Sequence, residues 1–235
     1  MLVADGDVVG VNLAFYSERT IDGRTERFCN VGAWCVLPAH RLHALKPLKA
    51  LLAQEGYHFT DLSPSGSVVA VNERLGFRFV ETDTLLLPNL PWPTRPRGCT
   101  ISSDPAAIEV ALTGRDLQIY RDHAGASAAR HLVLTRGGES CYVVFRKDRR
   151  KGLPVFASLL YVSDPELLYA LRRPLARHLL LRHGALATLA EERALAGVPR
   201  LSRRLGRHRP KMLRSPSLEP DRIDYLYSEL VCVPW

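Results

Sequence analysis

The stretch from Trp34 to Phe79 constrains the fold of this chain more than any other part of its sequence. Short apolar runs alternate here with amphipathic segments, and the pattern predicts helices over 41–55 and 68–75. Strands are expected up to Leu37, over 57–62 and over 77–80. The first helix carries one apolar stripe, formed by Leu42, Leu45, Leu48, Leu51 and Leu52. This alternating order of three strands and two helices predicts parallel strands with helices packed against the sheet.

The residues before this stretch read as three antiparallel strands. Met1–Ala4 and Val8–Tyr16 flank a tight turn at Gly6, and a third strand over Glu26–Val36 follows a turn at Asp22-Gly23. The sequence therefore predicts an antiparallel meander that leads into the strand–helix unit.

Charge and proline content divide the chain near residue 100. Residues 1–100 hold 10 Lys and Arg against 10 Asp and Glu, whereas residues 101–235 hold 22 against 14, so the whole excess of +8 lies in the second part. Four prolines between Leu85 and Arg97 exclude a helix and most ladder pairing, and they predict an extended linker. We expect one module over 1–88, a linker over 89–100 and a second, basic module over 101–235.

The second part repeats the plan of the first more faintly. We expect a helix from Asp104-Pro105 to about residue 120, a hairpin over 131–147 and a strand over 155–162. Ser163-Asp164 precedes a predicted helix that ends at Gly184, and a strand over 186–190 follows. The last segment, 223–233, is predicted to be a strand that closes the second sheet or crosses to the first.

Two short motifs resemble those of the GNAT superfamily of acyl-CoA N-acyltransferases. Val36-Leu37-Pro38-Ala39-His40-Arg41 is similar to the family's V-x-P-x-x-R, and Asn72-Glu73-Arg74-Leu75-Gly76-Phe77 to its Y-E-K-L-G-F. The resemblance covers about residues 1–88. It implies an α/β (α+β) fold with a mixed, mostly antiparallel central sheet flanked by helices, in two tandem GNAT-like modules of which the second is degenerate. The family's usual first strand and two helices are not found ahead of the first hairpin.

The resemblance also implies a site for acetyl-CoA or another acyl-CoA. A helix N-terminus attracts phosphate through unpaired N–H groups and the positive end of the helix dipole. Backbone groups at three strand positions would polarise the thioester, and the loop that follows would hold the pyrophosphate. The expected cofactor-binding residues are Cys35, Val36, Leu37, Arg41, Leu42, His43, Ala44, Leu45 and Lys46. A plain amphipathic helix with solvated basic residues is the alternative.

Acyl transfer to an amine needs a base, and Glu26 and His40 are the candidates. Asn72 occupies the position at which the family often has a tyrosine that protonates the leaving thiolate. An amide cannot donate a proton in this way, so Asn72 would orient a water. Cys35 is a possible nucleophile, although its apolar neighbours suggest a buried, inert thiol.

Several classes of protein are disfavoured. No apolar run is long enough for a membrane span, and the N-terminus lacks the basic region of a secretory signal, so a cytoplasmic protein is expected. Five scattered cysteines indicate neither a metal site nor a disulfide framework. Arg200–Arg214 holds seven basic residues and is a possible but not favoured nucleic-acid contact.

The sequence leaves three functions open. The favoured one is an acyl-CoA-dependent N-acyltransferase that acts on a small-molecule or peptide amine by direct attack on the thioester. The alternatives are a non-catalytic GNAT-like binding protein and an aminoacyl-tRNA-dependent transferase of the peptidoglycan-bridge type.

Overall fold

The computed structural model describes residues 1–80, 83–93, 98–150, 152–205 and 210–234, and these form two compact units. The first unit comprises Met1–Glu81, Arg209–Ile223 and Tyr227–Glu229; the second comprises Thr82–His208, Asp224–Leu226 and Leu230–Trp235. Both units are therefore discontinuous in sequence. The sequence-based modules, 1–88 and 101–235, were each expected to be one continuous segment, and their limits remain predictions.

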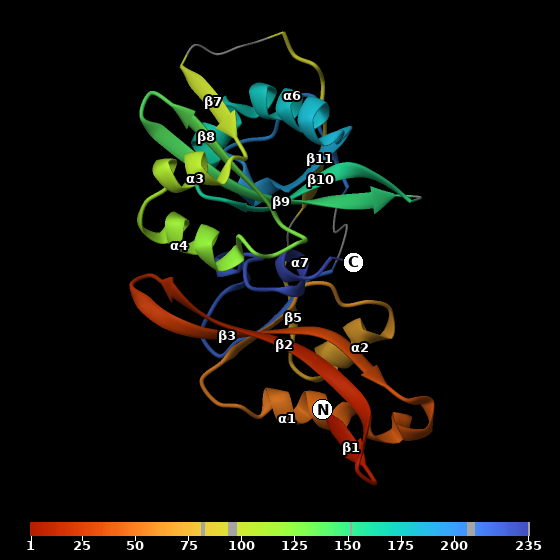
Figure 1. Ribbon diagram of the computed structural model, residues 1–235. Helices are drawn as coiled ribbons and strands as arrows, with labels where there is room; N and C mark the ends of the chain where they lie inside the picture. Colours follow the sequence, from red (N-terminus) through yellow and green to blue (C-terminus); the bar gives the residue numbers. More distant parts are fainter. Residues whose placement is uncertain (81–82, 94–97, 151, 206–209, 235) are drawn as a thin grey trace. The chain divides into compact units, whose positions relative to one another are not determined.

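The first unit is built on a six-stranded sheet of order β1-β2-β3-β4-β13-β5 (Figure 1). Its strands are β1 Leu2–Ala4, β2 Asp7–Ile21, β3 Arg24–Val36, β4 His58–Asp61, β5 Arg78–Phe79 and β13 Met212–Arg214. Only β3 and β4 are parallel among its described pairs, because a helical crossover joins them. The expected antiparallel meander and the strand–helix–strand order are both present.

One face of this sheet packs against helices α1 (Leu45–Leu52) and α2 (Ser67–Arg74). Leu48 and Leu52 of α1 join Cys29, Phe59 and Met212 in the core. Cys29 and Phe59 point to the same face because side chains alternate along a strand. Consequently Phe28, Asn30, His58 and Thr60 point to the opposite face.

The helix predicted over 41–55 is shorter than expected and begins differently. Pro38–His43 forms a 3₁₀ helix, η1, and the α-helix α1 starts only at Leu45. Pro47 accounts for part of this, since proline is tolerated in the first turn of an α-helix but not further inside it. The leucine stripe is interrupted accordingly: Leu48 is buried, whereas Leu42 is 97% exposed.

Two predictions about strand pairing are wrong. The proline-rich linker was expected to avoid most ladder pairing, but its first residues form β6, Thr84–Pro88, between β11 (Ala187–Glu191) and β12 (Arg203–Arg204). Pro88 ends the strand, so its missing N–H does not interrupt the ladder. The chain over 223–233 is not a strand; it contains a turn and helix α7, Glu229–Cys232. The strand that enters the first sheet is β13, and residues 94–97 and 206–209 of the linker and basic stretch lie outside the described residues.

The second unit contains a seven-stranded sheet of order β12-β6-β11-β10-β9-β8-β7 (Figure 1). Its further strands are β7 Cys99–Ser102, β8 Arg130–Arg136, β9 Glu139–Arg150, β10 Leu153–Val162, β11 Ala187–Glu191 and β12 Arg203–Arg204. The pair β10–β11 is parallel, and helices α5 Pro165–Ala170 and α6 Arg172–His183 connect its strands. The plan of the first unit is thus repeated.

Side-chain caps start two of the predicted helices where the sequence places them. Asp104 accepts the N–H of Ala107 at the start of α3, Pro105–Ala111, and Asp164 accepts that of Leu167 at the start of α5. The helix expected to reach residue 120 is interrupted after Leu112, and α4, Gly114–His123, begins at a glycine with φ of 52°. No helix of the described residues is both long and apolar enough to cross a bilayer.

Candidate active site

The parallel strands β3 and β4 are paired over only three positions. Phe28, Cys29 and Asn30 of β3 face His58, Phe59 and Thr60 of β4. Beyond these residues β3 continues to Val36 alongside β2, whereas β4 ends at Asp61. The register of β3 against β2 also shifts between Val31 and Trp34, which is a β-bulge around Gly32. The two strands therefore stop pairing beside the bulge in β3.

A buried carboxylate lies where the strands part. Asp61, the last residue of β4, is 6% exposed. Its Oδ2 accepts a hydrogen bond of 2.7 Å from Asn72 Nδ2, and its Oδ1 accepts the Ser63 N–H at 3.3 Å. Asn72 itself is 2% exposed, so its amide does not face solvent. The residue predicted to orient a water instead holds this carboxylate.

Burial raises the pKa of Asp61 to about 7 from an ordinary value of 3.8. The hydrogen bonds from Asn72 and Ser63 oppose the rise in pKa, and the negative charge of Glu229 adds to it. The Glu229 carboxylate accepts a hydrogen bond of 2.6 Å from the Ser63 hydroxyl. A carboxyl group with such a pKa exchanges protons near neutral pH, which suits a general base.

The Asn30 side chain ties the parallel strands together beside this group. Its Nδ2 donates to the Thr60 carbonyl at 3.2 Å and to Thr60 Oγ1 at 3.1 Å. Its Oδ1 accepts the backbone N–H of Glu229 at 3.3 Å. Asn30, Thr60 and Glu229 are all buried, and Glu229 is remote in sequence from the two strand residues.

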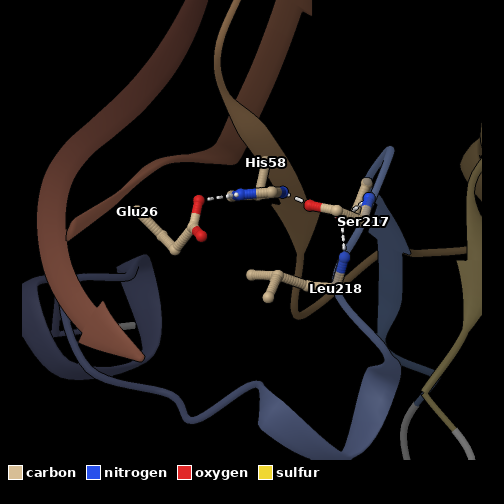
Figure 2. A network of polar contacts seen from close by, with 5 residues as sticks. Glu26, His58, Ser217 and Leu218 are labelled. Carbon is tan, nitrogen blue, oxygen red and sulfur yellow. Dashed lines mark hydrogen bonds and ion pairs between the residues drawn. The ribbon is translucent and has the colours of Figure 1, made fainter. Parts of the chain in front are cut away.

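A second polar array joins Glu26, His58 and Ser215. Glu26 Oε2 lies 2.9 Å from His58 Nε2, and Ser215 Oγ lies 2.8 Å from His58 Nδ1. Figure 2 shows His58 between Glu26 and the turn that contains Ser217 and Leu218. This is the order of groups found in an activated serine nucleophile, acid–imidazole–hydroxyl.

The hydrogen bonds of Ser215 argue against a nucleophile. Its Oγ also accepts the backbone N–H groups of Ser217 at 3.1 Å and Leu218 at 2.7 Å. A hydroxyl has two lone pairs and one proton, so both lone pairs are occupied and the proton goes to His58 Nδ1. His58 is 4% exposed. The array therefore fixes the turn after β13 against β4. The Glu26 carboxylate, a candidate base from the sequence, contacts His58 in this array.

We expect Ser215→Ala to destabilise the protein by about 1–3 kcal/mol, because it leaves the buried His58 nitrogen and two N–H groups without their partner. Chemical denaturation followed by circular dichroism measures this. Ser217→Ala is the matched control, since only the backbone of Ser217 takes part, and it should stay within about 0.5 kcal/mol of the parent. Equal effects of the two changes would contradict the assignment.

The predicted cofactor residues lie together along the end of β3, η1 and the start of α1. Most side chains from Cys35 to Lys46 are exposed, including that of Cys35, whose predicted burial is wrong. Two of the expected backbone donors are used within the protein: the Leu37 N–H donates to Val9 O at 2.9 Å, and the Ala44 N–H donates to Arg41 O at 3.1 Å. His40 lies in η1, away from the Glu26 array in sequence and half-buried.

Comparison with known proteins identifies the fold. No protein-family model and no curated protein matches the sequence. A GCN5-related N-acetyltransferase from Anabaena variabilis matches 86% of this chain with a TM-score of 0.52 and 10% identity. A second GCN5-related N-acetyltransferase, from Kribbella flavida, matches 90% of this chain with a TM-score of 0.52 and 12% identity. A probable N-acyltransferase from Enterococcus faecalis matches 90% of this chain with a TM-score of 0.54 and 12% identity.

This chain has the GNAT fold. The resemblance inferred from the two motifs and the predicted fold class are thereby confirmed. At these identities the likeness concerns the fold alone. The chain spans 58%, 58% and 60% of the lengths of the three GNAT proteins, so it corresponds to about three fifths of each.

Sequence reasoning missed Asp61, His58 and Ser215. A carboxylate near the end of a predicted strand, 57–62, was the available signal for Asp61. The turn that Ser215 forms with Ser217 and Leu218 is local, but its contact with His58 spans 157 positions and leaves no pattern in the sequence. Within the described part of the chain, no three His, Cys, Asp or Glu side chains gather in a way that would hold a metal ion.

Proposed function

We propose that this GNAT-fold protein is an acyl-CoA-dependent N-acyltransferase that acts on a small-molecule or peptide amine. The proposal depends on one observation: the parallel strands β3 and β4 part at a β-bulge, and the buried Asp61 carboxyl lies at that point. Bulges leave a residue of one strand unpaired and are common next to active sites. A backbone N–H of the bulged segment around Gly32 is the candidate that polarises the thioester carbonyl.

The segment after β3 suits an anionic co-substrate. Arg41, His43 and Lys46 are exposed, and no acidic residue occurs between Glu26 and Glu55. The loss of the Leu37 and Ala44 N–H groups to internal hydrogen bonds leaves fewer backbone donors than a glycine-rich phosphate loop offers. The basic side chains would therefore supply most of the attraction for the pyrophosphate.

In this reaction Asp61 is the base, in place of Glu26 and His40, which were the candidates from the sequence. The amine nitrogen attacks the thioester carbon, and the resulting oxyanion is stabilised by backbone N–H groups. Asp61 removes a proton from the amine, directly or through a water, and the carbon–sulfur bond breaks to release the thiolate of coenzyme A. Asn72 orients Asp61 through their 2.7 Å hydrogen bond. No proton donor to the thiolate is assigned.

A non-catalytic binding role is the second candidate, and the occupied Leu37 and Ala44 amides favour it. Binding without turnover of acetyl-CoA in the presence of a panel of amines would support that role. The basic stretch gives little support to the tRNA-dependent alternative, because Met212 and Leu213 are buried strand residues.

Acetyl-CoA should bind, and Ala44→Glu should weaken that binding by about a hundredfold or more. A carboxylate at this position repels the pyrophosphate, and charges a few ångströms apart near a protein surface interact by several kcal/mol. Isothermal titration calorimetry measures the affinity. Ala50→Glu is the matched control, since Ala50 is exposed on α1 outside the predicted site. Undiminished binding by Ala44→Glu would place the phosphate site elsewhere.

A further inference from the structure

A cavity of about 380 Å³ lies within the second unit, on the side of the sheet that α5 and α6 cover. Its lining comes from strands β6, β10 and β11, from α5 and α6, and from the chain over 195–201. A volume of this size is within the range of small-molecule sites, roughly 300–1,000 Å³. It equals the volume of about a dozen water molecules in the liquid.

The deep part of the cavity is apolar. Its buried walls are the side chains of Leu159, Leu168, Leu175 and Leu195. The buried polar residues of the lining, Asn89 and Thr188, satisfy each other: Thr188 Oγ1 donates to Asn89 Oδ1 at 2.9 Å. Asn89 Nδ2 donates to Ala185 O at 3.0 Å. An occupant of this part would therefore be hydrocarbon, because the walls offer it little hydrogen bonding.

The exposed part of the lining is cationic. Arg172, Arg173 and Arg200 line the cavity, and all three reach solvent to some degree. The lining contains no Asp or Glu, and no carboxylate of the described residues forms an ion pair with these three guanidinium groups. Three arginines around one opening that form no ion pair with a described carboxylate attract an anion.

Aromatic contacts hold two of these arginines in place. The Arg172 guanidinium lies 4.3 Å from the Tyr169 ring centre and donates to the Tyr169 carbonyl at 2.6 Å. The Arg173 guanidinium lies 4.9 Å from the ring centre of Trp92, which also lines the cavity. Stacked guanidinium groups lose less conformational freedom when they bind a carboxylate or phosphate.

We propose that this cavity binds an anionic amphiphile: a single hydrocarbon chain among the leucines and a carboxylate or phosphate head at Arg172, Arg173 and Arg200. Every residue involved belongs to the second unit. The inference is therefore independent of the acyl transfer proposed for the first unit. A fatty acid and a phosphorylated lipid share this chemistry.

Calorimetric titration of the intact chain with decanoate, decyl phosphate, decanol and acetate tests the proposal. At least one of the two anionic amphiphiles should bind, and decanol and acetate should bind at least about tenfold more weakly. Preference for decanoate over decyl phosphate would indicate a fatty acid, and the reverse a phosphorylated lipid. Failure of both to bind, or equal binding of decanol, would overturn the proposal. Saturable binding of an acidic peptide, with no binding of either amphiphile, would also overturn the proposal.

Two variants locate the site. The double change Arg172→Gln and Arg173→Gln should weaken the anionic amphiphile at least about tenfold and leave decanol unchanged. Arg182→Gln, an exposed arginine of α6 outside the lining, should leave both affinities unchanged. Ala176→Phe fills the cavity and should abolish binding, whereas Ala170→Phe, on the exposed side of α5, should not. Unaltered binding by a folded Ala176→Phe variant, checked by circular dichroism, would contradict the assignment.

Discussion

Replacing Asp61 by Asn is expected to abolish acyl transfer and, at the same time, to stabilise the protein at pH 8. Asn has the shape of a protonated Asp and keeps one of the two oxygens, so it can accept one of the two hydrogen bonds that Asn72 and Ser63 donate to the carboxylate. It lacks the basic oxygen that takes the proton of the amine. Loss of a general base lowers kcat by about 10²–10⁴-fold.

The gain in stability follows from the pKa of Asp61. The carboxyl titrates near 7 in the folded protein and near 3.8 when unfolded. A raised folded pKa stabilises the protein below pH 3.8, and this contribution is lost as the pH rises to about 7, because the unfolded chain releases the proton first. The difference between the two pKa values corresponds to roughly 4 kcal/mol. Asp61→Asn does not titrate, so its advantage over the parent should grow from pH 4 to pH 7 and then level off.

Urea denaturation at pH 4.5 and pH 8 measures the stability change, and release of the coenzyme A thiol measures the activity. Asp7→Asn, an exposed aspartate on β2, serves as the control and should change stability by less than about 0.5 kcal/mol at either pH. A stability difference between Asp61→Asn and the parent that does not change with pH would show that the Asp61 pKa is the same in the folded and unfolded states, and so would contradict its rise on burial. Full activity with a stabilised protein would remove Asp61 from catalysis.

Truncating Leu213 to Ala should destabilise the protein by about 2–5 kcal/mol. Leu213 is fully buried on β13, which lies between β4 and β5 and pairs with both. The removed methyl groups leave a cavity at this fully buried position of the sheet. Because β13 is a central strand, loosening it exposes the edges of two neighbours.

Leu42→Ala provides the comparison in the same unit, because Leu42 is 97% exposed. Its stability should stay within about 0.5 kcal/mol of the parent. Thermal and urea denaturation of the two variants give the two values. A mild effect at Leu213, similar to that at Leu42, would mean that the Leu213 side chain is not buried in the folded protein.

Local patterns in the sequence predicted much of the fold. The alternation of apolar and polar residues located the meander and most strands, and glycines with positive φ, such as Gly76 and Gly184, ended helices where expected. The side-chain caps of Asp104 and Asp164 were equally local. These signals are reliable because each interaction lies within a few positions along the chain.

The order of strands could not be predicted in the same way. β6 follows the first unit in sequence but pairs with β11, and β13 comes from the basic stretch but pairs with β4. The three residues of β13 resemble many other short apolar runs, including the segment 223–233 that was expected to be a strand. A strand gains its stability from neighbours that are remote in sequence, so its own residues do not specify them.

The sequence by itself determined most of the helices and strands and, through two motifs, the resemblance to the GNAT fold. The tertiary structure decided which polar groups meet: Asp61 with Asn72 and Ser63, Glu26 with His58, and three arginines around one apolar cavity. The physical reason is that hydrogen-bond geometry and burial act over a few ångströms in space. Residues brought to that distance from remote parts of the chain leave no pattern in the sequence.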